Sequence, residues 1–194
     1  MGNTLGVMTQ SAAVVLVADF VTGAVHWAED AYARRDTPLI GRLVAEANIE
    51  HHHRPRAFLA HSWFSSSWDL LLLSMLLVGV AWWCEQLSWQ LWLFAILTAN
   101  ANQIHKWTHQ NPQENGRIVS WLQKLKLLQT QRHHARHHHG EKNSHYCVIT
   151  NVLNPVLEEL DVWKNVERFL EKRLGLKRRP NPTVKPVAVV IQKT

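Results

Sequence analysis

The sequence predicts an all-α integral membrane protein with about three short transmembrane helices and a histidine-rich helical cap on the cytoplasmic side. Three observations predict it. Apolar residues gather in runs of nearly spanning length, basic residues gather between and after those runs, and 13 histidines lie beside them. The whole chain, 194 residues with 46% hydrophobic residues and a net charge of +6, averages like an ordinary soluble domain, because averaging hides this segregation. Two cysteines, Cys84 and Cys147, are too few for a disulfide scaffold.

Two adjacent apolar runs predict a transmembrane hairpin. Residues 68–84 hold one charge, Asp69, near their start, and residues 87–104 hold none. Each run has roughly 17 or 18 residues, the short end of what a spanning helix needs. Seven of the ten tryptophans lie between positions 63 and 107, mostly near the ends of the runs, and tryptophan favours the membrane–water interface. The alternative is a buried helical hairpin of a soluble protein.

A third candidate span, residues 11–28, precedes the hairpin. It holds Asp19 and His26, which are costly in lipid and are therefore expected to face the protein interior or a site. No Lys or Arg occurs before Arg34, so this segment lacks the basic start of a signal peptide. Residues 1–10 are then expected to form an extracytoplasmic N-terminal segment.

Basic residues orient the predicted spans. Five arginines lie between the first and second spans, and from Arg117 onward 15 Lys and Arg face 6 Asp and Glu, whereas the turn near Glu85 has no base. The positive-inside rule puts both basic segments in the cytoplasm, in the inner membrane if the source is bacterial. Nucleic-acid binding could also explain the surplus, but no base-reading motif accompanies it, so no nucleic-acid partner is expected.

The segments after the hairpin favour two amphipathic helices and a tail. Residues 117–128 have apolar positions at helical spacing with lysines opposite, which is typical of a helix lying on a membrane surface. Residues 155–174 repeat the pattern with acids early and bases late, and Gly175 is a plausible stop. Residues 175–194 form a basic, proline-punctuated tail that we expect to be loosely ordered.

The histidines cluster on one predicted face of the membrane. Two spans separate the early histidines from the late ones, which returns the chain to the same side. His105 and His109 are four residues apart, as are His134 and His138, so each pair shares a helix face. Asp19, His26 and Asp30 form one stripe of the first helix. Neutral imidazole is a good ligand for iron, zinc, copper and nickel, and the number of histidines suits two metal ions better than one.

Other interpretations of these residues are weaker. A zinc protease helix would carry Glu after its first histidine, where this chain has Lys106. Cys147 could be a nucleophile near histidines, but packing at the start of an apolar stretch is the better interpretation. The histidine-rich loop could be a metal-buffering tract, Asp30 could orient an imidazole without ligating, and His53 and His139 are expected to be solvated neighbours of true ligands.

Taken together, the motifs identify a resemblance. The chain resembles the plasmanylethanolamine desaturase family, the CarF-type and animal enzymes that make the vinyl ether of plasmalogens. It is similar to the plant chloroplast desaturase of phosphatidylglycerol acyl chains as well. NQIHKWTH resembles the plasmanyl branch, whereas TPLIG and the late RRP resemble the plant branch. The carrying segments are ADFVTGAVHWAED (18–30), TPLIG (37–41), EHHHRP (50–55), NQIHKWTH (102–109), LQ (122–123), RHHARHH (132–138), YCVIT (146–150) and LNPVLEELDVW (153–163).

The resemblance implies a site, a chemistry and partners. Residues 11–174 would form the membrane lipid desaturase domain. Two iron ions would reduce O2 with electrons from an external donor such as a ferredoxin or a cytochrome, and the oxidant would desaturate a membrane phospholipid. Three further residues would be additional metal ligands: Asp30, which matches the family's aspartate, and His61 and His133, which match the plasmanyl branch only. The implied catalytic iron ligands are His26, His51, His52, His105, His109, His134, His137 and His138.

Three functions follow as hypotheses. The leading one is desaturation of an alkyl-ether phospholipid to the vinyl ether of a plasmalogen. The second is an acyl-lipid desaturase of the phosphatidylglycerol type, or a related di-iron hydroxylase. The third is a membrane protein that binds metal without catalysis.

Overall fold

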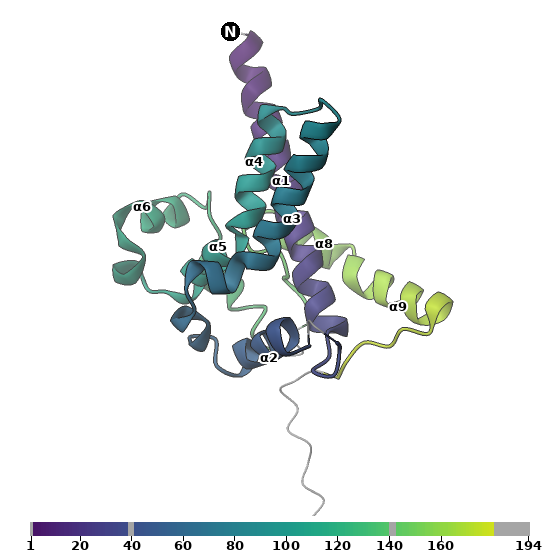
Figure 1. Cartoon of the computed structure of the whole chain (residues 1–194). Coiled ribbons are helices and arrows are strands. Elements are labelled where there is room, and N and C mark those ends of the chain that lie inside the picture. The colour runs from purple at the N-terminus through teal and green to yellow at the C-terminus, as the bar shows by residue number, and fades with distance from the viewer. Residues whose placement is uncertain (1, 39–40, 140–142, 181–194) are drawn as a thin grey trace, which may run out of the picture.

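The computed structural model describes residues 2–38, 41–139 and 143–180, and all regular structure in these ranges is helical. The all-α prediction is therefore confirmed. Helices α1 (Gly2–Tyr32), α3 (Trp63–Trp83) and α4 (Trp89–Ala99) pack as a bundle, drawn in the upper half of Figure 1. Around its lower end lie α2 (Glu46–His53), α5 (Ala101–His109), α6 (Pro112–Lys124), α7 (Gln131–His134), α8 (Leu153–Glu159) and α9 (Val162–Leu174), with short π-helical and 3₁₀ turns at Gly41–Ala45 and Ala57–Ala60.

Among the residues that the structure describes, two helices are long and apolar enough to cross a membrane, Thr4–Tyr32 within α1 and Trp63–Trp83. Only 11% of the apolar window of the first and 17% of that of the second are buried in the protein. The core helix of a soluble protein would be covered, so this exposure disfavours the soluble hairpin and supports a membrane protein. The large apolar residues that α3 exposes are Trp63, Phe64, Leu72, Leu73, Met75, Leu76, Leu77, Val80, Trp82 and Trp83.

The second apolar run of the predicted hairpin, residues 87–104, is divided between two helices. Helix α4 has 11 residues, and Asn100, with φ −103° and ψ 5°, separates it from α5. An α-helix of that length is only roughly 16 Å long, about half the thickness of a bilayer core. The hairpin turn at Glu85 lies where it was expected, and Ser88 caps the start of α4 by accepting from the Leu91 N–H. A count of three spans and the cytoplasmic orientation stay predictions.

Asp19 is fully buried in the middle of α1 and bonds to a distant segment. Its carboxylate accepts hydrogen bonds from the backbone N–H of Ile149 at 2.8 Å and of Thr150 at 3.0 Å, and from the Thr150 hydroxyl at 2.6 Å. The charge therefore faces protein, as the sequence predicted, and its bonds fix the segment of residues 146–151 against α1. Gln129, also fully buried, donates from its side chain to the carbonyl of Cys147 and holds the same segment from the other side.

The amphipathic helix expected at residues 117–128 starts earlier and ends earlier than predicted. Asn111 and Glu114 form a capping box that starts α6 at Pro112, and Gly116, at φ 71°, interrupts it. Beyond that break the helix exposes Ile118 and Trp121, the apolar side chains that a membrane-surface helix would present.

The single helix predicted over residues 155–174 is wrong. Asp161 adopts the left-handed conformation at φ 48° and separates α8 from α9. No proline or glycine at this position indicates the break in the sequence. Gly175 ends α9 at φ 66°, as expected. The boundary drawn after residue 10 falls inside α1. The first residues of the tail pack on the end of α1, where the Arg179 N–H donates to Ala31, and residues 181–194 lie outside the described residues.

Replacing Asp19 with alanine should destabilise the fold. The substitution leaves three donors of Ile149 and Thr150 buried without an acceptor, and we expect a loss of about 3 kcal/mol or more, because each orphaned group keeps its desolvation penalty. Thermal unfolding of the purified protein in detergent measures this as a lower melting temperature. Asp36→Ala, at an exposed position, is the matched control, and equal melting temperatures for the two variants would contradict the assigned role of Asp19.

Candidate metal centre

The eight predicted ligand histidines and Asp30 meet at the lower end of the helical bundle. Helical spacing explains the pairs: His26 and Asp30 share a face of α1, and His105 and His109 share a face of α5. Helix α2 contributes two adjacent histidines, and α7 with the turn after it contributes the last three. The ligand atoms form two buried groups, His51, His105, His109, His134 and His138 in the first, and His26, Asp30, His52 and His137 in the second.

The first group consists only of imidazoles. Its five ligand atoms all lie within 4.8 Å of one another. The Nε2 atom of His105 lies 2.9 Å from that of His134 and 3.2 Å from that of His109, and His134 and His138 approach to 3.0 Å. Nitrogen ligands bound at about 2.1 Å to one metal ion lie roughly 3 Å apart at right angles, so this spacing fits a shared ion.

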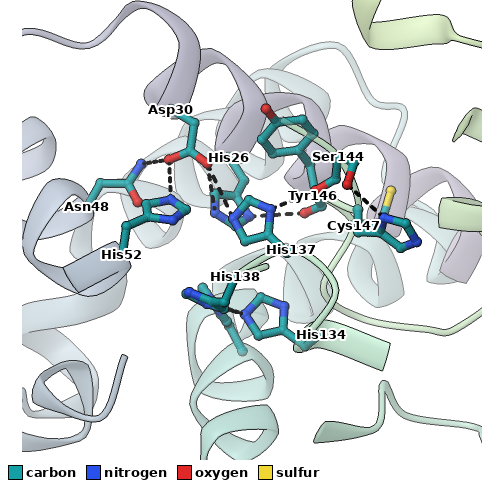
Figure 2. Close-up of polar contacts among 12 residues, drawn as sticks. His26, Asp30, Asn48, His52, His134, His137, His138, Ser144, Tyr146 and Cys147 are labelled. Atoms are coloured by element: carbon teal, nitrogen blue, oxygen red, sulfur yellow. Dashed lines mark hydrogen bonds and ion pairs between the residues drawn. The ribbon is translucent and has the colours of Figure 1, made fainter. Parts of the chain in front are cut away.

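The second group is built around the carboxylate of Asp30, and Figure 2 shows this arrangement. One oxygen lies 2.8 Å from His52 Nε2 and accepts from Asn48 at 2.8 Å. The other oxygen lies 3.3 Å from His137 Nε2 and 3.8 Å from His26 Nε2. A carboxylate among three imidazoles is a donor set that suits iron or zinc.

Backbone carbonyls orient two imidazoles of the second group. His26 Nδ1 lies 3.1 Å from the Tyr146 carbonyl, and His137 Nδ1 lies 2.7 Å from that of Ser144. Because a carbonyl only accepts, both Nδ1 atoms must carry the proton, which leaves the Nε2 lone pairs facing the group. Both Nε2 atoms are buried without a hydrogen-bond partner, as is one oxygen of Asp30. Such orphaned acceptors fit a bound metal ion.

The two groups are neighbours, and burial keeps the imidazoles of the first group neutral. The ring centroids of His26 and His105 are 5.2 Å apart, and those of His52 and His138 are 5.3 Å apart, across the division between the groups. Burial, together with neighbouring histidines, lowers the pKa of His105 well below its ordinary value and that of His109 to about 3. Neutral imidazole is the form that binds metals, so the site is prepared for two ions.

The other histidines lie outside both groups. His61 is exposed beside Phe58, and His133 lies against His145, with ring centroids 5.6 Å apart, so neither of these predicted additional ligands is brought to the clusters. His53 and His139 are exposed, as expected of bystanders. Burial also raises the pKa of the Cys147 thiol, which keeps it protonated and agrees with a packing role.

Two contributions to the second group lie outside the residues predicted from the sequence. Asn48 lies four residues before His52 on α2, so its bond to Asp30 could have been inferred from helical spacing. The carbonyls of Tyr146 and Ser144 could not, because any residue supplies a carbonyl and only the fold brings these two to His26 and His137.

A cavity of about 750 Å³ opens onto the metal groups. It reaches His26, His51 and His105, and apolar residues of α1 and α3, including Val25 and Leu70, line its wall on the side of the membrane helices. Four carboxylates line it as well, and no Lys or Arg of the described chain does: Glu29, Glu46, Glu50 and Asp69. A long apolar molecule with a polar end fits such a cavity.

Comparison with known proteins gives the family. The lipid desaturase domain matches residues 15–181, nearly the whole chain. The chain belongs to the lipid desaturase family. Mouse plasmanylethanolamine desaturase 1 is 31% identical over 84% of this chain and 65% of its own length, and the Myxococcus xanthus plasmanylethanolamine desaturase is 29% identical over 83% and 59%. The resemblance inferred from the motifs is thereby confirmed.

Relatives of a second kind match as closely. A chloroplastic fatty acid desaturase 4-like protein of Arabidopsis thaliana is 31% identical over 84% of this chain and 60% of its own length. This chain therefore spans about two thirds or less of the mouse, Myxococcus and Arabidopsis relatives. No solved structure matches.

Removing ligands from one group should lower the metal content by the ion of that group. His105→Ala/His109→Ala removes two nitrogens from the first group and His26→Ala/His52→Ala two from the second, so each variant should bind about one ion per chain where the unaltered protein binds two. Mass spectrometry of the metals in purified protein measures the stoichiometry. His53→Ala/His139→Ala is the control, and a loss of metal there, or a single ion in the unaltered protein, would contradict the division into two groups.

Proposed function

We propose that the chain is an O2-dependent di-iron lipid desaturase that makes the vinyl ether of a plasmalogen from an alkyl-ether phospholipid. The single observation that carries the proposal is the pair of adjacent buried ligand groups beside a cavity of about 750 Å³ with apolar walls. Family membership supports the desaturase chemistry. In the overall reaction O2, two electrons and two protons are consumed, a –CH2–CH2– unit becomes –CH=CH–, and two molecules of water form.

Two iron ions are proposed for the two groups, one for each. When bound, they would supply the oxidant that an unactivated C–H bond requires. The chain's own residues hold the ligands in place: Asp30 fixes His52, and the carbonyls of Tyr146 and Ser144 fix His26 and His137. The surrounding protein keeps bulk water from the groups, since His134 and His137 are nearly or fully inaccessible. An external one-electron carrier, such as a ferredoxin or a cytochrome, supplies the electrons.

The cavity also supports a choice of lipid headgroup. Apart from histidines, its only ionisable side chains among the described residues are acidic, and the Asp69 carboxylate is half-buried in its wall. A carboxylate stabilises a nearby ammonium group and repels an anion, so this lining favours the amine of an ethanolamine headgroup over phosphatidylglycerol, which is anionic. The lining thus favours the plasmanyl substrate, whereas the plant relatives keep the acyl-lipid alternative as the second candidate.

Lipid analysis tests the function. Expression in a host that contains ether phospholipids but no vinyl ethers should produce vinyl-ether lipids, recognised because mild acid cleaves a vinyl ether and leaves an acyl double bond intact. His138→Ala should abolish the product, because it removes a ligand from the first group, while His139→Ala, at the exposed neighbouring position, should keep it. An acid-stable double bond would instead establish the acyl-lipid desaturase, and bound metal without any lipid product would establish the non-catalytic metal protein.

Headgroup preference tests the cavity carboxylates. Asp69→Asn should lower the ratio of ethanolamine-lipid to phosphatidylglycerol-lipid turnover, roughly tenfold for the loss of one charge-assisted contact. The measurement is a competition between the two lipids in mixed vesicles with purified protein and a reductant. Asp36→Asn makes the same change at an exposed position outside the cavity lining and should leave the ratio unaltered. An unaltered ratio in the cavity variant would refute the headgroup assignment.

A further inference from the structure

A line of aromatic rings leads from the second ligand group to the end of α1. The Tyr146 ring lies 5.1 Å from that of His137 and 5.7 Å from that of His26, measured between centroids. Trp163 lies 5.5 Å from Tyr146, and Trp27 lies 5.4 Å from Trp163. Tyr32 follows at 5.5 Å from Trp27. Each ring is in contact with the next, from two metal-group histidines to a half-buried tyrosine at the last residue of α1.

Polar contacts tie this line together at its edge. Arg178 donates to the Tyr146 hydroxyl at 2.9 Å and pairs with Glu167, and Glu167 accepts from the Trp27 indole at 2.9 Å. Trp163, in contrast, buries its indole N–H without a hydrogen-bond partner, a penalty that phenylalanine would avoid. None of the four aromatic residues lines the cavity. The line therefore approaches the metal groups by a route separate from the proposed lipid site.

Positive charge surrounds the outer end of the line. Arg34, Arg35 and Lys177 are exposed there. Arg179 is half-buried, its guanidinium donates to the backbone carbonyls of Asp30 and Ala33, and the Asp30 charge stabilises it. Asp36 and Glu171 are the exposed acidic residues near this end, so these four basic residues still outnumber the acidic ones. A surface with this excess of positive charge attracts an acidic partner and raises its rate of association.

We propose that an acidic one-electron carrier protein docks on these arginines and that Tyr32, Trp27, Trp163 and Tyr146 conduct its electrons to the metal groups. The inference rests on the proposed function, which needs two electrons per double bond. Electron tunnelling weakens steeply with distance and with gaps in packing, and the line of contacting rings leaves no such gap. The rings act as a bridge and are not themselves oxidised or reduced: the carrier loses one electron per docking event, and two events supply the pair.

The docking half of the proposal is tested by binding. A soluble, strongly acidic plant-type ferredoxin is the probe, and the protein is held in nanodiscs of uncharged phosphatidylcholine at low salt. Arg34→Glu/Arg35→Glu should weaken binding roughly tenfold or more, because it reverses charge at the docking surface. Arg117→Glu/Lys124→Glu makes the same charge change on exposed α6 and should leave binding as it was.

Any other result of the binding experiment would contradict the proposed docking surface. Equal weakening in both charge-reversed proteins would show that only net charge matters. Unaltered ferredoxin binding in Arg34→Glu/Arg35→Glu would show that the carrier docks elsewhere. No ferredoxin binding to the unaltered protein, together with a weaker affinity of the variant for anionic vesicles, would show that these arginines contact lipid.

The conducting half is tested at Trp163. Trp163→Leu removes the middle ring and should slow oxidation of reduced ferredoxin by the anaerobic, metal-loaded protein severalfold, while Trp163→Phe keeps a ring and should retain most of the rate. Metal content and melting temperature of both variants establish that the site and fold are intact. An unaltered rate in Trp163→Leu at full metal content would show that the ring line is only packing.

A small-molecule reductant separates this inference from the function itself. With dithionite in place of ferredoxin, Trp163→Leu should form product like the unaltered protein, because the reductant does not need the docking surface. If the unaltered protein makes no lipid product with dithionite either, the proposed function fails, whereas ferredoxin binding and oxidation still report on the route.

Discussion

Imidazole nitrogens that converge inside a protein have lost their hydrogen bonds to water, and their lone pairs repel one another. The rest of this structure depends on holding such nitrogens close together. The atoms of the first ligand group lie within 4.8 Å of one another and are imidazole nitrogens throughout. Burial lowers the pKa of these rings and keeps them neutral, so protonation does not offset the repulsion between their lone pairs. A metal cation relieves it fully, and the elements that carry the ligands must therefore be held together even before the ion binds.

That assembly depends on a chain of buried amide and carboxylate contacts. Asp19 holds residues 149 and 150 to α1, and Gln129 joins the same segment to the start of α7. Gln123 then donates to the carbonyls of Gln129 and Trp107, which brings in α5. A charge in the middle of a membrane helix, which is costly in lipid, is thus used to position a loop whose Tyr146 carbonyl orients His26.

Much of the site follows from local spacing and topology in the sequence. Residues four apart on one helix, such as His105 and His109, point the same way, and two apolar runs return the late histidines to the early ones. A spacing of four residues does not place two side chains on the same face where the helix ends between them. His133 and His137 are also four apart, yet α7 stops at His134, and the turn beyond it directs His137 to Asp30 and leaves His133 beside His145. The break at Asp161 likewise depends on packing that no local motif encodes.

The cavity and the aromatic line reach the ligand groups from different elements of the fold. The cavity meets His26, His51 and His105 between α1, α3 and α5, whereas the aromatic line meets His26 and His137 by way of the end of α1, α9 and Tyr146. A carrier protein on the arginines after α1 and a lipid in the cavity would therefore not compete for the same surface. His26 touches both sides: it lines the cavity, contacts the Tyr146 ring and belongs to the second ligand group. Its fixed tautomer, set by the Tyr146 carbonyl, thus matters to the approach of substrate and of electrons alike.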